Sequence, residues 1–95
     1  MIRRHIEGPQ FVASLHRAGV RARSPQLEAI KETVRAIIEA ENLPGPLDYE
    51  VLIPPVRTAW CRRIPGQNLW LFYRVSDDAV YILLVTRMPP VPVIR

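Results

Sequence analysis

A chain of 95 residues has the length of one domain. Its apolar fraction of 48% and charged fraction of 23% are typical of a globular protein and exclude wholesale disorder. The formal net charge of +4 arises from twelve arginines and one lysine against nine acidic residues. Arginine's planar fork of donors matches phosphate and carboxylate groups, so this composition favours an anionic partner. General arginine enrichment in a GC-rich genome explains the ratio equally well.

Targeting and cofactor signals are missing from the sequence. The single cysteine, Cys61, cannot form an internal disulfide, so the fold does not depend on an oxidising compartment. No apolar run follows the basic N-terminus, and the longest apolar run, residues 79–85, is too short to cross a bilayer. The sequence contains no metal-ligand spacing and no glycine-rich phosphate loop. We therefore expect a cytoplasmic protein with no membrane partner, no metal and no cofactor.

The N-terminal segment predicts a weak strand and a short helix. Residues 1–6 carry two isoleucines at period two, which favours an edge strand. Gly8 and Pro9 then break the chain. Apolar residues recur at helical spacing until Gly19 ends the helix; they are Phe11, Val12, Leu15 and Ala18.

A longer second helix begins at Ser24 and Pro25. Serine can accept a hydrogen bond from a free backbone N–H at the helix start, and proline at the first helical position loses nothing. One apolar stripe follows at helical spacing; it consists of Leu27, Ile30, Val34, Ile37 and Ile38. Two prolines and a glycine in residues 43–46 require the helix to end before them.

The C-terminal half predicts an antiparallel meander. Turn-forming residues at 65–68 and 76–78 separate strand-like runs, so successive runs must be neighbours in one sheet. These runs are residues 59–64, 69–75 and 80–87. Residues 49–53 predict a further short strand, which Pro54 and Pro55 end and leave at an edge of the sheet or in an irregular crossing. The prolines of residues 88–95 exclude an inner strand and predict an extended tail along the surface.

These elements predict one α+β domain over residues 1–95, with two N-terminal helices packed on one face of a three- to four-stranded antiparallel sheet. Alternation along the run 69–75 divides its side chains between two faces. We assign Leu69, Leu71, Tyr73 and Val75 to the helix-covered core. Trp70, Phe72 and Arg74 are assigned to the open face because that set holds the charge. Large aromatics beside arginine predict a surface that binds a partner.

The element order and three short motifs resemble the RelE/ParE superfamily of toxins from bacterial type II toxin–antitoxin pairs. W-C-R-R-I at residues 60–64, Y-R-V-S-D-D at residues 73–78 and the final T-R at residues 86–87 are similar to patterns of the YoeB-like branch. The resemblance covers nearly the whole chain in architecture. It implies a small basic protein neutralised by an antitoxin segment wrapped on its surface, and it leaves room for a higher-order toxin–antitoxin complex.

Members of this superfamily differ in activity, so the fold does not fix the function. RelE-like and YoeB-like members cleave messenger RNA in the ribosomal decoding site, whereas ParE-like members poison DNA gyrase and have no nuclease activity. The leading hypothesis is inhibition of translation by ribosome-associated mRNA cleavage. The enzyme would then be a metal-independent endoribonuclease, in which a ribose 2′-OH attacks the adjacent phosphate.

Such chemistry needs a base, cations and an acid around one phosphate. The resemblance implies Arg63 and Arg87 as a phosphate clamp and Glu50 as the carboxylate that some members use. Each arginine can equally be a solvated strand residue. The residues expected to bind RNA or a partner are Arg57, Arg62, Trp70, Phe72 and Arg74.

Two positions depart from the nuclease pattern. Trp70 lies three residues before the motif tyrosine, where the nucleases carry an arginine, and an indole cannot neutralise a phosphorane. Met88 follows Arg87 where YoeB-like nucleases place a histidine or tyrosine. The two histidines of the chain, at positions 5 and 16, are near the N-terminus. Trp70 could still stack on a base or anchor an antitoxin helix.

Two alternatives to mRNA cleavage therefore stay open. One is a ParE-like inhibitor of DNA gyrase without nuclease activity. The other is a non-catalytic interaction module whose open aromatic face binds an acidic protein. Cys61 is not a candidate nucleophile, because neither a histidine nor a helix N-terminus lies beside it in the sequence.

Overall fold

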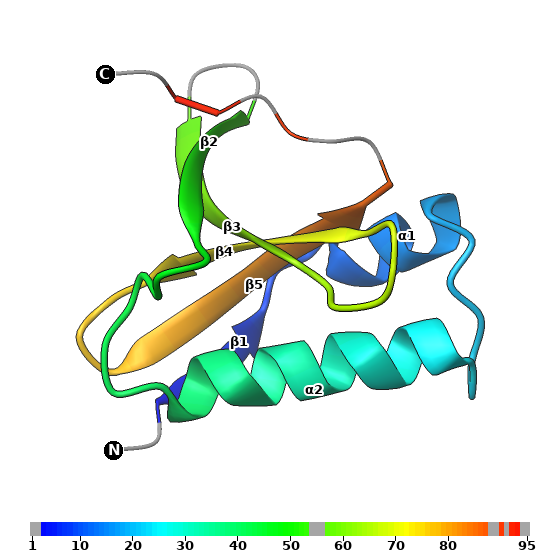
Figure 1. Ribbon diagram of the computed structural model, residues 1–95, viewed down its shortest axis with the longest axis horizontal. Helices are drawn as coiled ribbons and strands as arrows, with labels where there is room; N and C mark the ends of the chain where they lie inside the picture. The colour runs from blue at the N-terminus through cyan, green and yellow to red at the C-terminus, as the bar shows by residue number, and fades with distance from the viewer. Residues whose placement is uncertain (1–2, 54–56, 88–89, 91, 94–95) are drawn as a thin grey trace.

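The computed structural model of the chain describes residues 3–53, 57–87, 90, 92 and 93. Two helices and five strands form an α+β domain in the order strand, helix, helix and four strands (Figure 1). The elements are β1 Arg4–Glu7, α1 Phe11–Arg17, α2 Pro25–Glu39, β2 Tyr49–Ile53, β3 Arg57–Arg63, β4 Trp70–Val75 and β5 Ala79–Thr86. The positions of both helices and of the C-terminal strands agree with the sequence prediction to within a few residues.

The sheet is larger than predicted and is mixed. Its strand order is β1-β5-β4-β3-β2. Strands β2 to β5 pair antiparallel, as expected of a meander, but β1 adds a fifth strand parallel to β5. A parallel neighbour requires a long intervening connection, and everything from α1 to β4 lies between these two strands. The prediction of three to four antiparallel strands is therefore corrected to a five-stranded mixed sheet.

Capping fixes the start of α2 as the sequence indicated. The Ser24 side chain precedes the helix and its Oγ accepts a hydrogen bond from the backbone N–H of Leu27 at 3.1 Å. Pro25 occupies the first helical position, where a missing N–H costs nothing. The helix buries one side against the sheet; the buried residues are Ile30, Thr33, Val34 and Ile37.

A buried serine joins α1 to the sheet. Ser14 is 2% exposed; its Oγ donates to the carbonyl of Phe11 at 2.6 Å and accepts the backbone N–H of Val85 at 2.9 Å. One hydroxyl thus satisfies a polar group of β5 while it lies inside an apolar core. The helix ends before Gly19, which adopts φ +75° as the sequence predicted for a glycine stop.

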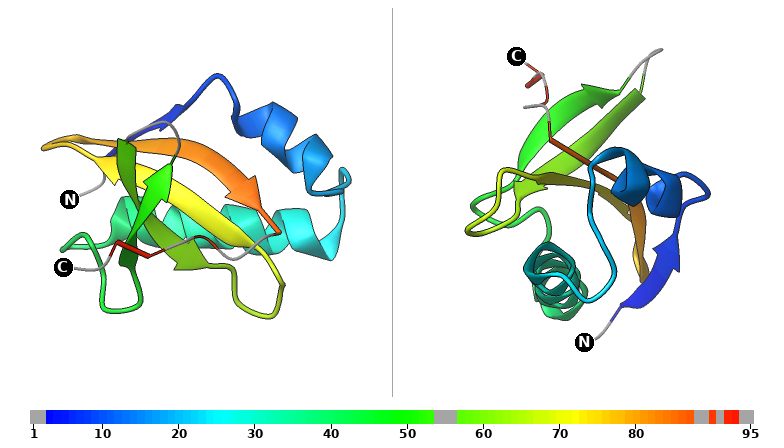
Figure 2. Two further views of the ribbon diagram at one scale, coloured as in Figure 1. Left: turned by 90° about the horizontal axis from the view of Figure 1, so that it is seen from above. Right: turned by 90° about the vertical axis from the view of Figure 1, so that its right-hand side faces the viewer.

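Two apolar clusters lie on opposite faces of the sheet. The first packs both helices against the sheet; its buried members are Phe11, Ala18, Ile30, Val34, Ile37, Ile64, Leu69, Leu71, Tyr73, Val80, Ile82 and Val85. The second, called here the hairpin cluster, lies on the other face; its buried members are Val51, Ala59, Cys61, Trp70 and Phe72. Figures 1 and 2 show the β2–β3 hairpin rising over this face, on the side away from α2.

The hairpin cluster overturns the expectation of an open aromatic face. Trp70 and Phe72 do share one side of β4, but they are only 9% and 6% exposed. Strand β3 pairs with β4 only over its C-terminal half, from Trp60 to Arg63. Its N-terminal half diverges, as strong twist favours, and folds over the sheet. The aromatic side chains are therefore core residues.

A β-bulge in β5 brings two consecutive side chains to the hairpin cluster. Phe72 pairs with Leu84 and the next residue, Tyr73, pairs with Ile82, so Leu83 is an extra residue in β5. A bulge of this kind places two consecutive side chains toward one face. Leu83 and Leu84 accordingly both pack against the hairpin cluster.

Part of the C-terminal tail lies along the outer edge of β2. Pro92 forms an antiparallel bridge with Val51, and the N–H of Val93 donates to the carbonyl of Glu50 at 2.9 Å. Met88, which the sequence analysis singled out, lies outside the described residues, as do residues 1–2 of the predicted first strand.

We predict that Trp70→Arg destabilises the protein by about 3 kcal/mol or more, because the large-to-small loss of a buried tryptophan alone costs about that much and the guanidinium would be buried. Leu52→Arg is the matched control: Leu52 lies on β2, in the hairpin that covers Trp70, but is 46% exposed, so its replacement should stay within about 0.5 kcal/mol. Urea unfolding followed by circular dichroism measures both. Equal stability of the two variants would show that Trp70 does not belong to the core.

Candidate functional site

The three residues predicted to be catalytic lie in three different surroundings. Arg63 is the last residue of β3, and its guanidinium carbon lies 5.5 Å from the centroid of the Trp70 ring. Arg87 follows β5, and its Nε donates to the carbonyl of Ala18 at the end of α1. Glu50 lies on β2 and lines a cavity whose walls include neither of these arginines. The structure does not gather the three side chains around one space.

Strand alternation explains the separation of Glu50 from Arg63. The neighbours of Glu50 on β2, Tyr49 and Val51, both pack in the hairpin cluster. The Glu50 side chain therefore points to the other side of the strand. Arg63 is directly paired with Trp70 and shares its side of the sheet. Glu50 and Arg63 thus belong to opposite faces.

Arg62, predicted to bind RNA or a partner, is held by an internal carboxylate. Its Nε and Nη2 donate to the two oxygens of Asp48 at 2.6 and 2.8 Å. The backbone N–H of Gly45 donates to the same carboxylate at 2.7 Å, and the Tyr73 hydroxyl donates to it as well. The Asp48 side chain is fully buried and that of Arg62 is 16% exposed. The bidentate pair ties the loop before β2 to the core face of the sheet.

The pKa values of Asp48 and Arg62 both shift in the direction that favours the charged pair. Burial alone would raise the pKa of Asp48, but the hydrogen bonds from Arg62, Tyr73 and Gly45 outweigh burial and hold the pKa below its ordinary value of 3.8. The hydrogen bond to Asp48 raises the pKa of Arg62. Burial, followed by the bond to Asp48, raises the pKa of Tyr73. Asp48 and Arg62 therefore stay charged and Tyr73 stays protonated near neutral pH.

Cys61 lies inside the hairpin cluster and is not a nucleophile. Its side chain is fully buried, and burial raises the pKa of the thiol to about 11. The neighbouring Tyr49 pairs with it across β2 and β3, and burial followed by the hydrogen bond with Cys61 raises the pKa of Tyr49 to about 12. Both groups are therefore neutral at physiological pH. The thiolate is the reactive form of cysteine, so Cys61 acts as a packing residue.

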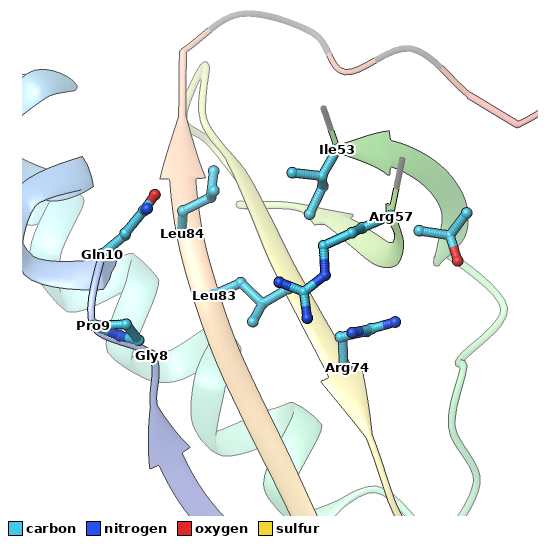
Figure 3. A pocket seen from close by; sticks show the side chains of 9 residues that line it. Gly8, Pro9, Gln10, Ile53, Arg57, Arg74, Leu83 and Leu84 are labelled. Atoms are coloured by element: carbon cyan, nitrogen blue, oxygen red, sulfur yellow. The ribbon is translucent and has the colours of Figure 1, made fainter. Parts of the chain in front are cut away.

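Two of the predicted binding arginines do come together. Arg57, at the start of β3, and Arg74, on β4, line one cavity of about 330 Å³, called here the arginine cleft. Figure 3 shows the Arg57 side chain extending from β3 toward Leu83, whereas the Arg74 side chain on β4 points away from Leu83. The other walls are three apolar side chains, Thr58 and the chain segment before α1; they are Ile53, Leu83, Leu84, Thr58, Gly8, Pro9 and Gln10. Both arginines are exposed.

The sequence analysis missed Asp48 and the role of Ser14. The sequence did contain a signal for Asp48. Arg62 lies two residues from both Trp60 and Ile64, so the three side chains share one face of the strand. Ile64 is a core residue, so this is the core face. An arginine on the core face of a strand needs a carboxylate partner, and Asp48 stands just before the neighbouring strand. Ser14 had no comparable signal, because a serine on a short helix is usually solvated.

The fold and the cleft define an α+β domain with an arginine-lined cavity beside its β2–β3 hairpin. No family model, no curated protein and no solved structure matches the chain. The resemblance to RelE/ParE-like toxins therefore rests on the element order and on the motifs at residues 60–64, 73–78 and 86–87.

Membrane and metal features add no further site to the described part of the chain. Neither helix there combines the length and the apolar character that crossing a bilayer requires. Within the same residues, no group of three or more His, Cys, Asp or Glu side chains is placed to hold a metal ion.

We predict that Asp48→Asn destabilises the protein by about 2–4 kcal/mol, because it leaves the Arg62 guanidinium largely buried without its counter-charge. Asp78→Asn is the control: Asp78 pairs with Arg4 at 3.4 Å, but both side chains are more than half exposed, so the loss should be below about 0.5 kcal/mol. Urea unfolding at pH 7 compares the two variants. Similar losses would show that the Asp48 network adds nothing beyond a surface pair.

The same pair of variants tests the pH dependence. The pKa of Asp48 is lower in the folded protein than in the unfolded chain, where it is about 3.9. Its contribution is therefore fully present above about pH 4 and is lost as the pH falls through the folded-state pKa. Between pH 7 and pH 3, the unfolding free energy of Asp48→Asn should fall less than that of the native sequence or of Asp78→Asn.

We predict that Cys61 of the folded protein reacts with a disulfide reagent at pH 8 at least about a hundredfold more slowly than the unfolded chain. A thiol pKa of about 11 against the ordinary 9.0 lowers the thiolate fraction by roughly that factor, and burial slows the reaction further. Release of the coloured thiol product with and without urea measures the ratio. Equal rates would mean that the hairpin cluster is open in solution.

Proposed function

We propose that this chain is the toxin component of a type II toxin–antitoxin pair and that it arrests growth by binding a macromolecular target rather than by cutting RNA. The order β1-α1-α2-β2-β3-β4-β5 supports the RelE/ParE-like part of this proposal. The motif at residues 60–64 falls on and just after β3, and the motif at residues 73–78 spans the end of β4 and its turn.

The separation of the expected catalytic side chains carries the choice of binding over cleavage. Attack of a 2′-OH on phosphate needs a base and cations within hydrogen-bond reach of one reacting group. Glu50 and Arg63 belong to opposite faces, and Arg87 is engaged with the end of α1. Trp70 occupies the place of the nuclease arginine and is a core residue. A catalytic centre would require the sheet itself to rearrange.

The non-cleaving branch of the resemblance suggests the target. ParE-like toxins act on DNA gyrase, so gyrase is the target that we propose for this chain. Its natural inhibitor would be an antitoxin with an acidic segment, because the chain carries a net charge of +4 and exposed arginines on several elements. Both partners place the protein in the bacterial cytoplasm.

Ribosome-associated mRNA cleavage is the second candidate, and one observation favours it. Trp70 is paired with Arg63 on one side and with Thr86 on the other. The backbones of Arg63 and Arg87 therefore lie at the same end of the sheet, on either side of β4. Both side chains are exposed, so an RNA strand that passes around this end of the sheet would meet two cations.

Induced expression distinguishes these candidates. We expect growth arrest, accumulation of cleaved gyrase–DNA complexes and inhibition of supercoiling by the purified protein, with no new RNA 5′ ends inside coding regions. New 5′ ends that disappear in Arg63→Gln would establish mRNA cleavage and reject the binding mechanism. Arg35→Gln on α2 is the control, because it removes one exposed charge far from Arg63 in the sequence. Normal growth, together with capture of a neighbouring gene's product, would reject the toxin assignment and leave an interaction module.

A further inference from the structure

The arginine cleft holds two cationic side chains without an internal counter-charge. Elsewhere in the fold, Arg62 pairs with Asp48 and Arg4 pairs with Asp78. Among the described residues, no ion pair or hydrogen bond involves the side chain of Arg57 or Arg74, and no acidic side chain lines the cleft. The cleft thus collects positive charge that a bound anion would neutralise.

The other walls of the cleft are suited to the uncharged part of a ligand. Leu83 and Leu84 both face it because the bulge in β5 turns two consecutive side chains to one side. Ile53 supplies a third apolar side chain from β2. A volume of about 330 Å³ falls at the small end of the range for small-molecule sites, roughly 300–1,000 Å³. One charged end and one apolar wall define an amphiphilic ligand.

The position of the cleft separates it from the residues expected to be catalytic. None of Arg63, Arg87 and Glu50 lines it. Arg57 starts β3 and Arg63 ends it, so the full length of that strand lies between the two sites. Arg74 also borders the adjacent cavity, where Glu50 is the acidic residue, but Arg57 does not. The cleft is therefore a site of its own.

We propose that the arginine cleft binds a phosphate monoester carried on a small planar or apolar body, such as a nucleoside monophosphate. A phosphate monoester carries about −1.5 to −2 charges at pH 7, which matches two guanidinium groups better than a single carboxylate does. Guanidinium forks also bind phosphate oxygens in pairs. The body would lie against Leu83, Leu84 and Ile53. This inference does not depend on the toxin assignment.

Isothermal titration at low ionic strength tests the site with adenosine 5′-monophosphate, inorganic phosphate and adenosine. We expect saturable binding of the monophosphate, weaker binding of phosphate and none of adenosine. Arg57→Gln and Arg74→Gln should each lower the affinity for the monophosphate at least tenfold. Arg35→Gln removes the same charge from α2, whose residues do not line the cleft, and should change affinity less than twofold. Equal weakening by all three variants, or no binding of the monophosphate, would overturn the proposal.

Leu83→Ala tests the apolar wall. This substitution should lower the affinity for adenosine 5′-monophosphate and leave the affinity for inorganic phosphate unchanged, because only the nucleoside part of the ligand contacts that wall. A circular dichroism melt of each variant confirms that the fold is intact before affinities are compared. Unchanged binding of both ligands by folded Leu83→Ala would overturn the placement of the body.

The phosphate monoester could come from a free nucleotide or from the 5′ end of an RNA chain, and a tetranucleotide distinguishes the two sources. If the 5′-phosphorylated form binds more tightly than the free nucleotide, the chain end is the ligand. If it binds no better, the free nucleotide is. Equal affinity of the 5′-phosphorylated and 5′-hydroxyl forms would overturn a monoester site, because binding would then be general attraction to the RNA backbone.

Discussion

The divergence of the β2–β3 hairpin from β4 is the constraint on which the rest of this molecule depends. Strand β3 pairs with β4 only from Trp60 to Arg63, and the remainder of the hairpin folds back over the sheet. The hairpin cluster fills the space beneath it, with Trp70 and Phe72 contributed by β4. Both helices cover one face of the five-stranded sheet. The hairpin cluster therefore covers apolar surface on the other face, which the helices do not reach. The Asp48–Arg62 pair fixes the loop at the base of the hairpin from the opposite, helix-covered face.

The same divergence decides where the charges lie. It carries Arg57 over the sheet, to the cavity that Arg74 borders from β4. At the other end of β3, Arg63 stays beside Trp70 because that part of the strand is still paired. One strand therefore presents two arginines to two different places. The exposed arginines are distributed by backbone geometry rather than gathered on one flat surface, and a partner would meet them as separate contacts.

Local sequence signals predicted the helix ends and the faces of the strands, which depend on neighbouring residues. They did not predict contacts between segments that are distant in the sequence. The Ser24–Pro25 start of α2 and the glycine stop at Gly19 were correct because capping and positive φ depend on a few adjacent residues. Period-two alternation correctly placed Trp70 and Phe72 on one face. Alternation says nothing of what covers a face, however, so their burial was missed. The parallel pairing of β1 with β5 and the bond from Val85 to Ser14 join residues more than seventy positions apart, and no periodicity records such contacts.

The burial of Trp70 also bears on how this scaffold relates to the nucleases it resembles. In those enzymes the corresponding position is implied to carry an arginine that faces substrate. Here the position lies under the hairpin, where an unpaired guanidinium would lose its hydration without gaining a counter-charge. A tryptophan at this position and the closure of the hairpin over it favour each other, because the indole gives the hairpin apolar surface to bury. One substitution at Trp70 would not open this face of the sheet to a nucleic acid, because the hairpin cluster covers it. Arg57, at the start of β3, and Arg74, on β4, are exposed and line the arginine cleft beside this core. No acidic side chain and no histidine is among the described residues that line this cleft, so its two arginines are suited to binding rather than to phosphoryl chemistry.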